Sequence, residues 1–312
     1  MRSGTGGVEN SSFLCNDVIM KNTHIEHPED FILTGDLSVL DWFLADSHLS
    51  VKIDGAPAIV WGTDPATGTF FVGTKSVFNK KKIKINHSHE EIDLNHTGNV
   101  ADILHHCFDA LPRIDWIAQG DFIGFGGSDT YCPNTITYRF QQIIRQDVII
   151  APHTVYVAEH DLRDAIASPM IDCPDDTSRV KFVKPNCEQL DEDFYEIVAF
   201  TRQMSTLVDF VNDKHAARLK KNINHCIRNN FSVNDDDFDC DPNLIRLWKL
   251  VKSIKDDMLF LCRDDGPLSF IGDDICDGEG YVRVNDYGVF KLVDRAGFSH
   301  ANFNNSRFHC AS

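Results

Sequence analysis

The pattern of hydrophobic and polar positions changes twice along the chain. From about residue 17 to residue 160, short apolar runs alternate with Gly, Pro, Asn and Asp, which is typical of strands joined by turns. The predicted strands are 50–53, 58–62, 69–73, 116–123, 135–140, 148–150 and 155–158. Two stretches with helical spacing, 37–45 and 99–111, interrupt the strands. This part therefore predicts an α+β fold with antiparallel strands.

From about residue 188 to residue 262 the apolar spacing becomes helical. Helices are predicted over 190–212, 214–228 and 242–261, and Pro242 suits the first turn of the third helix. The chain then returns to strands at 280–284 and 288–293, whose short connection predicts a hairpin. We therefore predict a flexible tail over 1–16, a β-rich domain formed by 17–187 and 265–312, and a helical subdomain over 188–264.

Composition narrows the function classes. The 312 residues suffice for one large domain or two of average size, and no apolar run approaches the ~20 residues that span a bilayer. The formal charge of −17 argues against a general electrostatic grip on nucleic acid, so any such contact is expected to be local. Ten cysteines without a C-x-x-C spacing indicate reduced thiols. We expect a cytoplasmic protein without membrane contact.

The first candidate for chemistry is the segment Lys52-Ile53-Asp54-Gly55. Lys52 ends a predicted strand, and Asp54 is placed two residues away on the same face of the extended chain. A lysine becomes a nucleophile when its ammonium loses a proton, which burial or neighbouring cations favour. So short a motif is equally compatible with an ordinary turn.

Four more charged residues, farther along the chain, interrupt or border apolar strands. They are Lys75, Asp121, Glu279 and Lys291. Charged groups in apolar strands are costly to bury unless they pair with one another or bind a charged ligand. Together with Lys52, these residues predict a shared pocket.

These motifs resemble those of the covalent nucleotidyltransferase superfamily, which includes ATP-dependent DNA and RNA ligases and mRNA capping enzymes. Lys52-Ile53-Asp54-Gly55 is similar to motif I, Gly120-Asp121-Phe122 to motif III, Glu279-Gly280-Tyr281-Val282 to motif IV and Phe290-Lys291-Leu292 to motif V, with Thr74-Lys75 near the place of motif Ia. Segments 52–86, 132–138 and 291–303 also resemble phage-encoded, RNA-ligase-like proteins. The resemblance covers about residues 20–160 and 270–305 and leaves the helical segment unmatched.

The resemblance implies an antiparallel-sheet nucleotidyltransferase core (an ATP-grasp-like ligase core) and three chemical steps. Lys52 would attack the α-phosphate of ATP, release pyrophosphate and hold AMP as a phosphoramidate. AMP would pass to the 5′-phosphate of an RNA or DNA end, and a 3′-hydroxyl would then displace it. The implied cofactors are ATP and Mg²⁺, with Mn²⁺ as a substitute. The chain ends soon after Lys291, which leaves no room for a C-terminal barrel and favours RNA ligases.

The resemblance also implies a role for each residue. Asp54, Asp121 and Glu279 would bind the metal, and Asp54 and Lys291 would join Lys52 in catalysis. Lys75, Asp121, Tyr156, Glu279 and Lys291 would bind the nucleotide with Lys52, Tyr156 by stacking on adenine. The basic run Lys80, Lys81, Lys82 and Lys84 would bind nucleic acid together with Lys75, weakly and with strong salt dependence in so acidic a chain.

The match has departures and an alternative register. Pro57, Asp121 and Val293 stand where relatives often carry Arg or Asn, Glu and Lys, respectively. In the alternative register, Glu159 would be the glutamate of motif IV, and Lys181 and Lys184 the lysines of motif V. Two other functions stay open: an adenylyltransferase whose acceptor is not a polynucleotide, and a nucleotide-binding protein without catalysis.

Two short histidine motifs contain metal-ligand residue types. They are His87-Ser88-His89 and His105-His106-Cys107. A structural zinc site usually takes four ligands from two such clusters, and the spacing here does not pair them into one. The sequence therefore does not predict a zinc site.

Overall fold

The computed structural model describes residues 25–295, and the predicted tail over 1–16 lies outside this range. The fold is mixed, with antiparallel sheets and helices, as the hydrophobic pattern predicts. The α-helices are α1 Pro28–Phe31, α2 Ser38–Leu44, α3 His89–Asn95, α4 Asn99–Ala110, α5 Tyr195–Ser205, α6 Asp213–Arg228 and α7 Pro242–Phe260. Short 3₁₀ helices are η1 Ile32–Thr34, η2 Lys75–Phe78, η3 Leu162–Asp164 and η4 Asp235–Asp237.

The strands form four sheets. They are β1 His48–Val51, β2 Ala58–Thr63, β3 Phe70–Gly73, β4 Ile117–Phe125, β5 Thr130–Tyr131, β6 Thr137–Arg139, β7 Val148–Val157, β8 Ile166–Pro169, β9 Val180–Phe182, β10 Cys187–Gln189, β11 Cys262–Asp264, β12 Leu268–Ile271, β13 Asp274–Cys276, β14 Tyr281–Asn285 and β15 Gly288–Leu292. The sheets have the orders β3-β2-β4-β7-β8, β1-β14-β15, β13-β12-β6-β5 and β10-β11. All pairs are antiparallel except β9, which runs parallel to β7.

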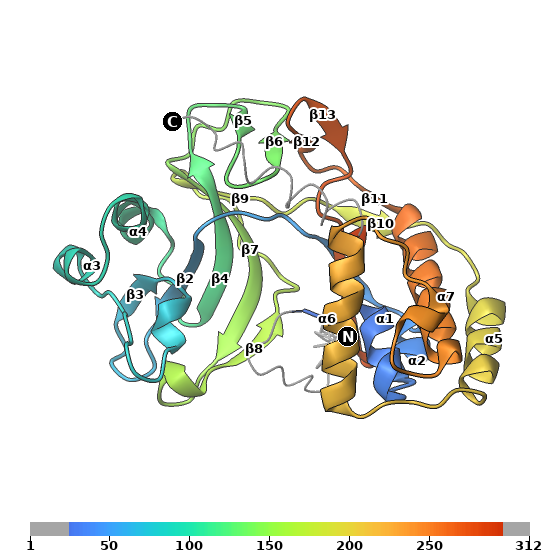
Figure 1. The fold of residues 1–312 in the computed structure, drawn as a ribbon. Helices are drawn as coiled ribbons and strands as arrows, with labels where there is room; N and C mark the ends of the chain where they lie inside the picture. The colour runs from blue at the N-terminus through green and yellow to red at the C-terminus, as the bar shows by residue number, and fades with distance from the viewer. Residues whose placement is uncertain (1–24, 296–312) are drawn as a thin grey trace, which may run out of the picture.

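The largest sheet is covered on one face by α3 and α4 (Figure 1). Helix α4 buries a stripe that includes Ile103, Leu104 and Cys107 in the same core as Ile59 and Trp61 of β2. The stripe follows from the helical spacing of the apolar residues, because positions three and four apart lie on one side of a helix. Alternate residues of β2, β4 and β7 face the other way and pack in two further cores, one with Tyr138 of β6 and one with Val77 of η2.

The three-stranded sheet β1-β14-β15 shares one core with α1, α2 and the helices α5 to α7, on the other side of the molecule (Figure 1). Phe290 of β15 makes edge-to-face contacts with Phe31 and Trp42, at ring-centroid distances of 4.7 Å and 5.2 Å. Trp248 of α7 is buried in the same core. The packing thus groups residues 28–51 and 281–292 with the helical segment, whereas the predicted division assigns them to the β-rich domain.

Several elements, such as α4, α7 and β15, form within one residue of their predicted limits. Strand β1 lies two residues earlier than the predicted 50–53, and β7 and α5 differ for local reasons. Strand β7 is continuous where two strands, 148–150 and 155–158, are predicted, because Pro152 lies opposite Gly120 at an irregularity of the β4–β7 register. Helix α5 is shorter than the predicted 190–212. It ends where the hydroxyls of Ser205 and Thr206 donate to carbonyls of the preceding turn. Within residues 25–295, no helix has the length and apolar character needed to cross a membrane.

Candidate functional site

Lys52 lies where the chain leaves the three-stranded sheet. It follows β1 directly, and its N–H donates to the carbonyl of Gly280 over 2.8 Å, which extends the β1–β14 pairing by one step. Its Nζ forms an ion pair with the carboxylate of Glu279, and both side chains are largely buried. The sheet therefore joins two residues that are 227 positions apart in sequence.

Gly280, which follows Glu279, makes the contact between Glu279 and Lys52 sterically possible. Gly280 has φ +105°, and a Cβ there would lie 2.2 Å from the carbonyl oxygen of Leu292. Only glycine adopts such a backbone without strain, and only a residue without a side chain fits against β15 at this point. The turn directs Glu279 toward the end of β1, where Lys52 begins the next segment.

Asp54 is held by residues from a different sheet. Its N–H donates to the phenolic oxygen of Tyr138 over 2.9 Å, and its carboxylate accepts from the side-chain amide of Asn134. Tyr138 belongs to β6 and is fully buried, and burial raises the pKa of its hydroxyl. Because the phenol stays neutral, it can accept the Asp54 N–H and keep its own proton.

Burial and mutual interaction shift the pKa of two charged groups around Lys52. Burial raises the pKa of Glu279 above its usual value, opposed by the charge of Lys52 and reinforced by that of Asp54. Burial and the positive charge of Lys52 lower the pKa of Lys291, opposed by Glu279. The charges of Lys52, Asp54, Glu279 and Lys291 therefore influence one another, whereas Lys75 and Asp121, which the shared-pocket prediction also includes, do not contribute to these two shifts.

Asp121 lies in β4, opposite Ala58 at the start of β2. Its carboxylate is 3.6 Å from Nε2 of His153, a residue of β7 whose other ring nitrogen is 2.7 Å from the Thr154 hydroxyl. Asp121 is partly buried and His153 is partly exposed. This acid therefore belongs to an acid–histidine pair on the sheet, one strand away from the segment that follows Lys52.

Tyr156 is a core residue of the large sheet. It is 4% exposed, its ring packs on Phe78 of η2 with centroids 4.3 Å apart, and its hydroxyl donates to the Gln119 side chain over 2.7 Å. Burial raises the pKa of this phenol. Because the ring is enclosed in the core, Tyr156 is not part of the proposed nucleotide site.

The basic run is exposed, with one exception. Lys75 begins η2, and Lys80, Lys81 and Lys82 follow it on the surface. Nζ of Lys84 instead donates to the backbone carbonyl of Asn95 at the end of α3. The surface therefore presents Lys75 and Lys80–82 to a ligand, whereas Lys84 also supports the local fold.

The residues of the alternative register make contacts with their own neighbours. Glu159 is 88% exposed and lies 3.5 Å from His160. Lys181 pairs with Asp176 over 2.7 Å, and Lys184 pairs with Asp175 over 2.8 Å. The contact between Lys52 and Glu279 therefore favours the register with Glu279 and Lys291.

The three carboxylates predicted to bind metal do not form a complete ligand set. Within residues 25–295, no group of three or more His, Cys, Asp or Glu side chains is placed to hold a metal ion. Mg²⁺ is commonly bound by one or two carboxylates, with water and substrate phosphates as the other ligands. Glu279 with Asp54 fits that partial role, and Asp121 is placed near His153 instead.

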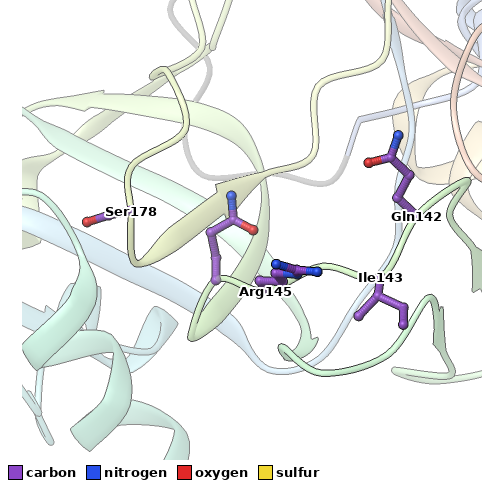
Figure 2. Close-up of a pocket in the computed structure, with 5 residues that line it drawn as sticks. Gln142, Ile143, Arg145 and Ser178 are labelled. Atoms are coloured by element: carbon purple, nitrogen blue, oxygen red, sulfur yellow. The ribbon is translucent and has the colours of Figure 1, made fainter.

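Two surface cavities lie elsewhere. One, of about 620 Å³, is lined by Gln142, Ile143, Arg145, Gln146 and Ser178 (Figure 2). The second, of about 560 Å³, shares Gln142, Ile143 and Gln146 and extends to Lys181 and Lys184. Neither is lined by Lys52, Asp54, Glu279 or Lys291. The candidate site is defined by the contacts and charges around Lys52, which lie outside both cavities.

Three supporting residues are not predicted as site residues from the sequence. Tyr138 and Asn134 hold Asp54, and His153 faces Asp121. The only signal for the first two is that segment 132–138 resembles phage proteins, and that likeness indicates no contact. Tyr138 and Asp54 are 84 positions apart, so only the tertiary structure joins them.

Comparison with known proteins identifies a family whose function is unknown. No curated protein and no solved structure matches the chain. One family model, described as a family of unknown function (DUF6267), matches residues 22–240 and 239–307. These two matches cover most of the 312 residues. The chain therefore belongs to the DUF6267 family.

Proposed function

We propose that this protein is an ATP-dependent nucleotidyltransferase of the RNA ligase type, with Lys52 as its nucleophile. The observation that carries the proposal is the buried ion pair between Lys52 and Glu279, with Lys291 and Asp54 in electrostatic contact. A lysine nucleophile needs a group that takes its proton and a cationic surrounding for the phosphate under attack. Glu279 and Lys291 supply these two functions.

The first reaction joins the Lys52 nitrogen to the α-phosphorus of ATP. One ammonium proton of Lys52 passes to Glu279 before the attack, the bond from that phosphorus to the bridging oxygen breaks, and pyrophosphate leaves with the electron pair and takes up the second proton of the nitrogen. The raised pKa of Glu279 makes this carboxylate a better proton acceptor than an exposed one. Lys291 is placed to neutralise charge on the α-phosphate. Mg²⁺, held by Glu279 or Asp54 and the phosphates, would neutralise charge on the triphosphate.

In the second reaction, the oxygen of a 5′-phosphate attacks the same phosphorus, the phosphorus–nitrogen bond breaks, and the Lys52 nitrogen takes back the proton from Glu279 as it leaves. A 3′-hydroxyl then attacks the activated 5′-phosphate, the new phosphodiester forms and AMP leaves. Lys75 and Lys80–82 are the exposed cations available to bind the acceptor strand. The acidity of the whole chain implies that this binding weakens steeply with salt.

The first prediction concerns Lys52. The protein incubated with α-³²P-ATP and Mg²⁺ is expected to gain covalent label that survives alkali and is released by acid, as expected of a phosphoramidate, and Lys52→Ala is expected to abolish it. Lys181→Ala is the matched control, because Lys181 also makes an ion pair with a carboxylate, but away from Glu279. The measurement is radioactivity that stays with the denatured protein after gel electrophoresis. Absence of label on intact protein first treated with pyrophosphate would refute the proposal.

The acceptor is tested separately. Labelled protein is mixed with 5′-phosphorylated RNA, with the same RNA lacking the phosphate, and with DNA of the same sequence. Transfer of label to the phosphorylated RNA, followed by joining to a 3′-hydroxyl end, supports the ligase assignment. Labelling of Lys52 without transfer to any polynucleotide would instead assign an adenylyltransferase with another class of acceptor.

A further inference from the structure

We infer that His89 and His105 form a binding site for a divalent transition-metal ion of the zinc type between α3 and α4. His89 is the first residue of α3, and His105 lies in the middle of α4. The two residues come from the two histidine motifs, which the fold places face to face. The inference is independent of the proposed nucleotidyltransferase function.

The inner ring nitrogens of the pair point at each other. Nδ1 of His89 lies 2.7 Å from Nδ1 of His105. The rings are nearly parallel, with centroids 4.9 Å apart and planes 22° apart. Edge-to-face contact with Phe108, at a centroid distance of 5.1 Å, holds the ring of His89.

Both outer nitrogens contact carboxylates. Nε2 of His89 lies 3.0 Å from Asp109, and Nε2 of His105 lies 3.0 Å from Asp93. An ionised carboxylate only accepts hydrogen bonds, so each outer nitrogen carries its ring's hydrogen. In the neutral tautomers both lone pairs on the inner nitrogens then point into the same gap. Two lone pairs at this distance repel each other unless a cation lies between them.

A metal ion between the rings would be bound by the inner nitrogen of each histidine, while each outer nitrogen keeps its carboxylate partner. Metal-bound histidines typically donate their second nitrogen to a carboxylate, which orients the ring and raises its basicity, and here both rings have that support. Zn²⁺ binds imidazole nitrogen at about 2.0–2.1 Å, so two such ligands at a tetrahedral angle lie about 3.3 Å apart. The rings need to separate by about 0.6 Å and to tilt so that both lone pairs meet at the ion.

The neighbourhood favours a zinc-type ion over Mg²⁺. Imidazole nitrogen suits Zn²⁺, Cu²⁺ and Ni²⁺, whereas Mg²⁺ prefers oxygen. Within the described part of the chain no third His, Cys, Asp or Glu completes a ligand group. His89 is 44% exposed, so water can supply the remaining ligands. Two protein ligands imply a weaker site than the three or four of most zinc proteins.

The site lies on the outer side of the large sheet, with α3 and α4, and away from the helices α5 to α7 (Figure 1). Only three residues separate α3 from α4, so an ion held by both would fix the two helices to each other. We therefore assign the ion a structural role in the α3–α4 pair, with no part in the chemistry at Lys52.

The experiment measures Zn²⁺ binding to the metal-free full-length protein by isothermal titration calorimetry, with Co²⁺ absorption as a second probe. One equivalent of Zn²⁺ is expected to bind and to raise the melting temperature. His89→Gln and His105→Gln are each expected to weaken Zn²⁺ binding at least tenfold, and Asp93→Asn or Asp109→Asn about tenfold. Glutamine retains hydrogen-bonding capacity, and circular dichroism checks that each variant is folded.

His106→Gln is the matched control. His106 lies beside His105 on the same helix, but its Nδ1 contacts the backbone carbonyl of Asp102. This variant is expected to bind Zn²⁺ as the wild type does. If folded protein with both His89→Gln and His105→Gln binds Zn²⁺ with wild-type affinity and stoichiometry, the inference is overturned. It is equally overturned if the wild type binds no Zn²⁺, in which case the two rings share only a proton.

Discussion

The carboxylate of Glu279 combines burial with a cationic partner. Its side chain is 11% exposed and pairs with Lys52. Desolvation disfavours the charged form and raises the pKa of Glu279, while the positive charge of Lys52 acts in the opposite direction. The proposed reaction needs this group ionised, because only the carboxylate can accept a proton. The proposed activity is therefore expected above the pKa of Glu279 and is expected to be lost as the pH falls through it.

The second prediction follows from this sign. The rate of covalent labelling at Lys52 is expected to fall on the acid side at a pH above the usual range for a glutamate. Glu279→Gln is expected to lower the rate by about 10²–10⁴-fold, as for removal of a general base, and to remove this acid limb. Single-turnover labelling across pH measures both effects. An unchanged acid limb in the Glu279→Gln variant would assign it to another group.

Tyr138 leads to the third prediction. Its hydroxyl is the acceptor for the N–H of Asp54, and Tyr138→Phe leaves that donor without this partner. An unsatisfied buried donor costs about 1–3 kcal/mol, so we expect a lower free energy of unfolding and slower labelling of Lys52. Urea unfolding and the labelling assay measure the two effects.

The control for Tyr138→Phe is Tyr131→Phe, a neighbour whose hydroxyl bonds only within its own turn, to the backbone of Ser128. This variant is expected to lose stability while labelling Lys52 at a near-normal rate. Equal slowing in both variants would show that the effect comes from the β5–β6 region in general and not from support of Asp54.

At the scale of elements, the β14–β15 hairpin positions Glu279 through the backbone of Gly280. A side chain at Gly280 meets the carbonyl of Leu292 at 2.2 Å, and backbone must move to admit it. Gly272 offers a matched comparison, since it also has positive φ, +63°, but nothing lies within 4 Å of its added Cβ. Substitutions at the two glycines therefore distinguish the cost of backbone strain from the cost of steric clash.

The fourth prediction uses this pair. Gly272→Ala is expected to cost about 1 kcal/mol from the left-handed backbone alone. Gly280→Ala is expected to cost several-fold more and to slow labelling, because Glu279 and the Lys52–Gly280 hydrogen bond move with the hairpin. Chemical unfolding and the labelling assay report the two effects. Equal losses of stability would show that the contact with Leu292 relaxes at little cost.

Elements with a strong local pattern were predictable from sequence, and long-range pairings were not. The stripe of α7 and the turn between β14 and β15 depend on neighbours in sequence, and the helix and hairpin form where predicted. The contact of Lys52 with Glu279 was implied by the charged residues in apolar strands and by the family resemblance, but its geometry was not, since no local rule joins residues that far apart. The helix α3 was not predicted, because its seven residues have one buried position, Ile92.

At the scale of the whole molecule, a buried charge cluster connects the N-terminal helices to the C-terminal end of the described chain. Glu29 and Asp30 of α1 pair with Arg295 at 3.1 Å and 3.0 Å, and Glu29 also contacts Lys255 of α7 at 3.3 Å. All four are nearly inaccessible to solvent. Because the charges are buried together, removal of one leaves its partners uncompensated.

The fifth prediction is that Arg295→Leu lowers the free energy of unfolding by about 3–5 kcal/mol, as expected for breaking a buried pair. Lys249→Ala, which breaks a surface pair with Asp235, is the control and is expected to cost about 0–1 kcal/mol. Urea unfolding at low and high salt measures the difference. The loss in Arg295→Leu is expected to persist at high salt, because buried charges are poorly screened.

The segment from Lys52 to Pro57 crosses between two cores, and this has a consequence for how activity can be lost. Lys52 is fixed to the core that contains β1, β14 and the helices, through Gly280, whereas Asp54 is fixed to the core around Tyr138. The proposed nucleophile and its neighbouring acid are therefore positioned by two different hydrophobic cores. A change that rotates one core slightly against the other is expected to abolish covalent labelling of Lys52 while both cores stay folded. Thermal stability alone is therefore a poor measure of the proposed activity.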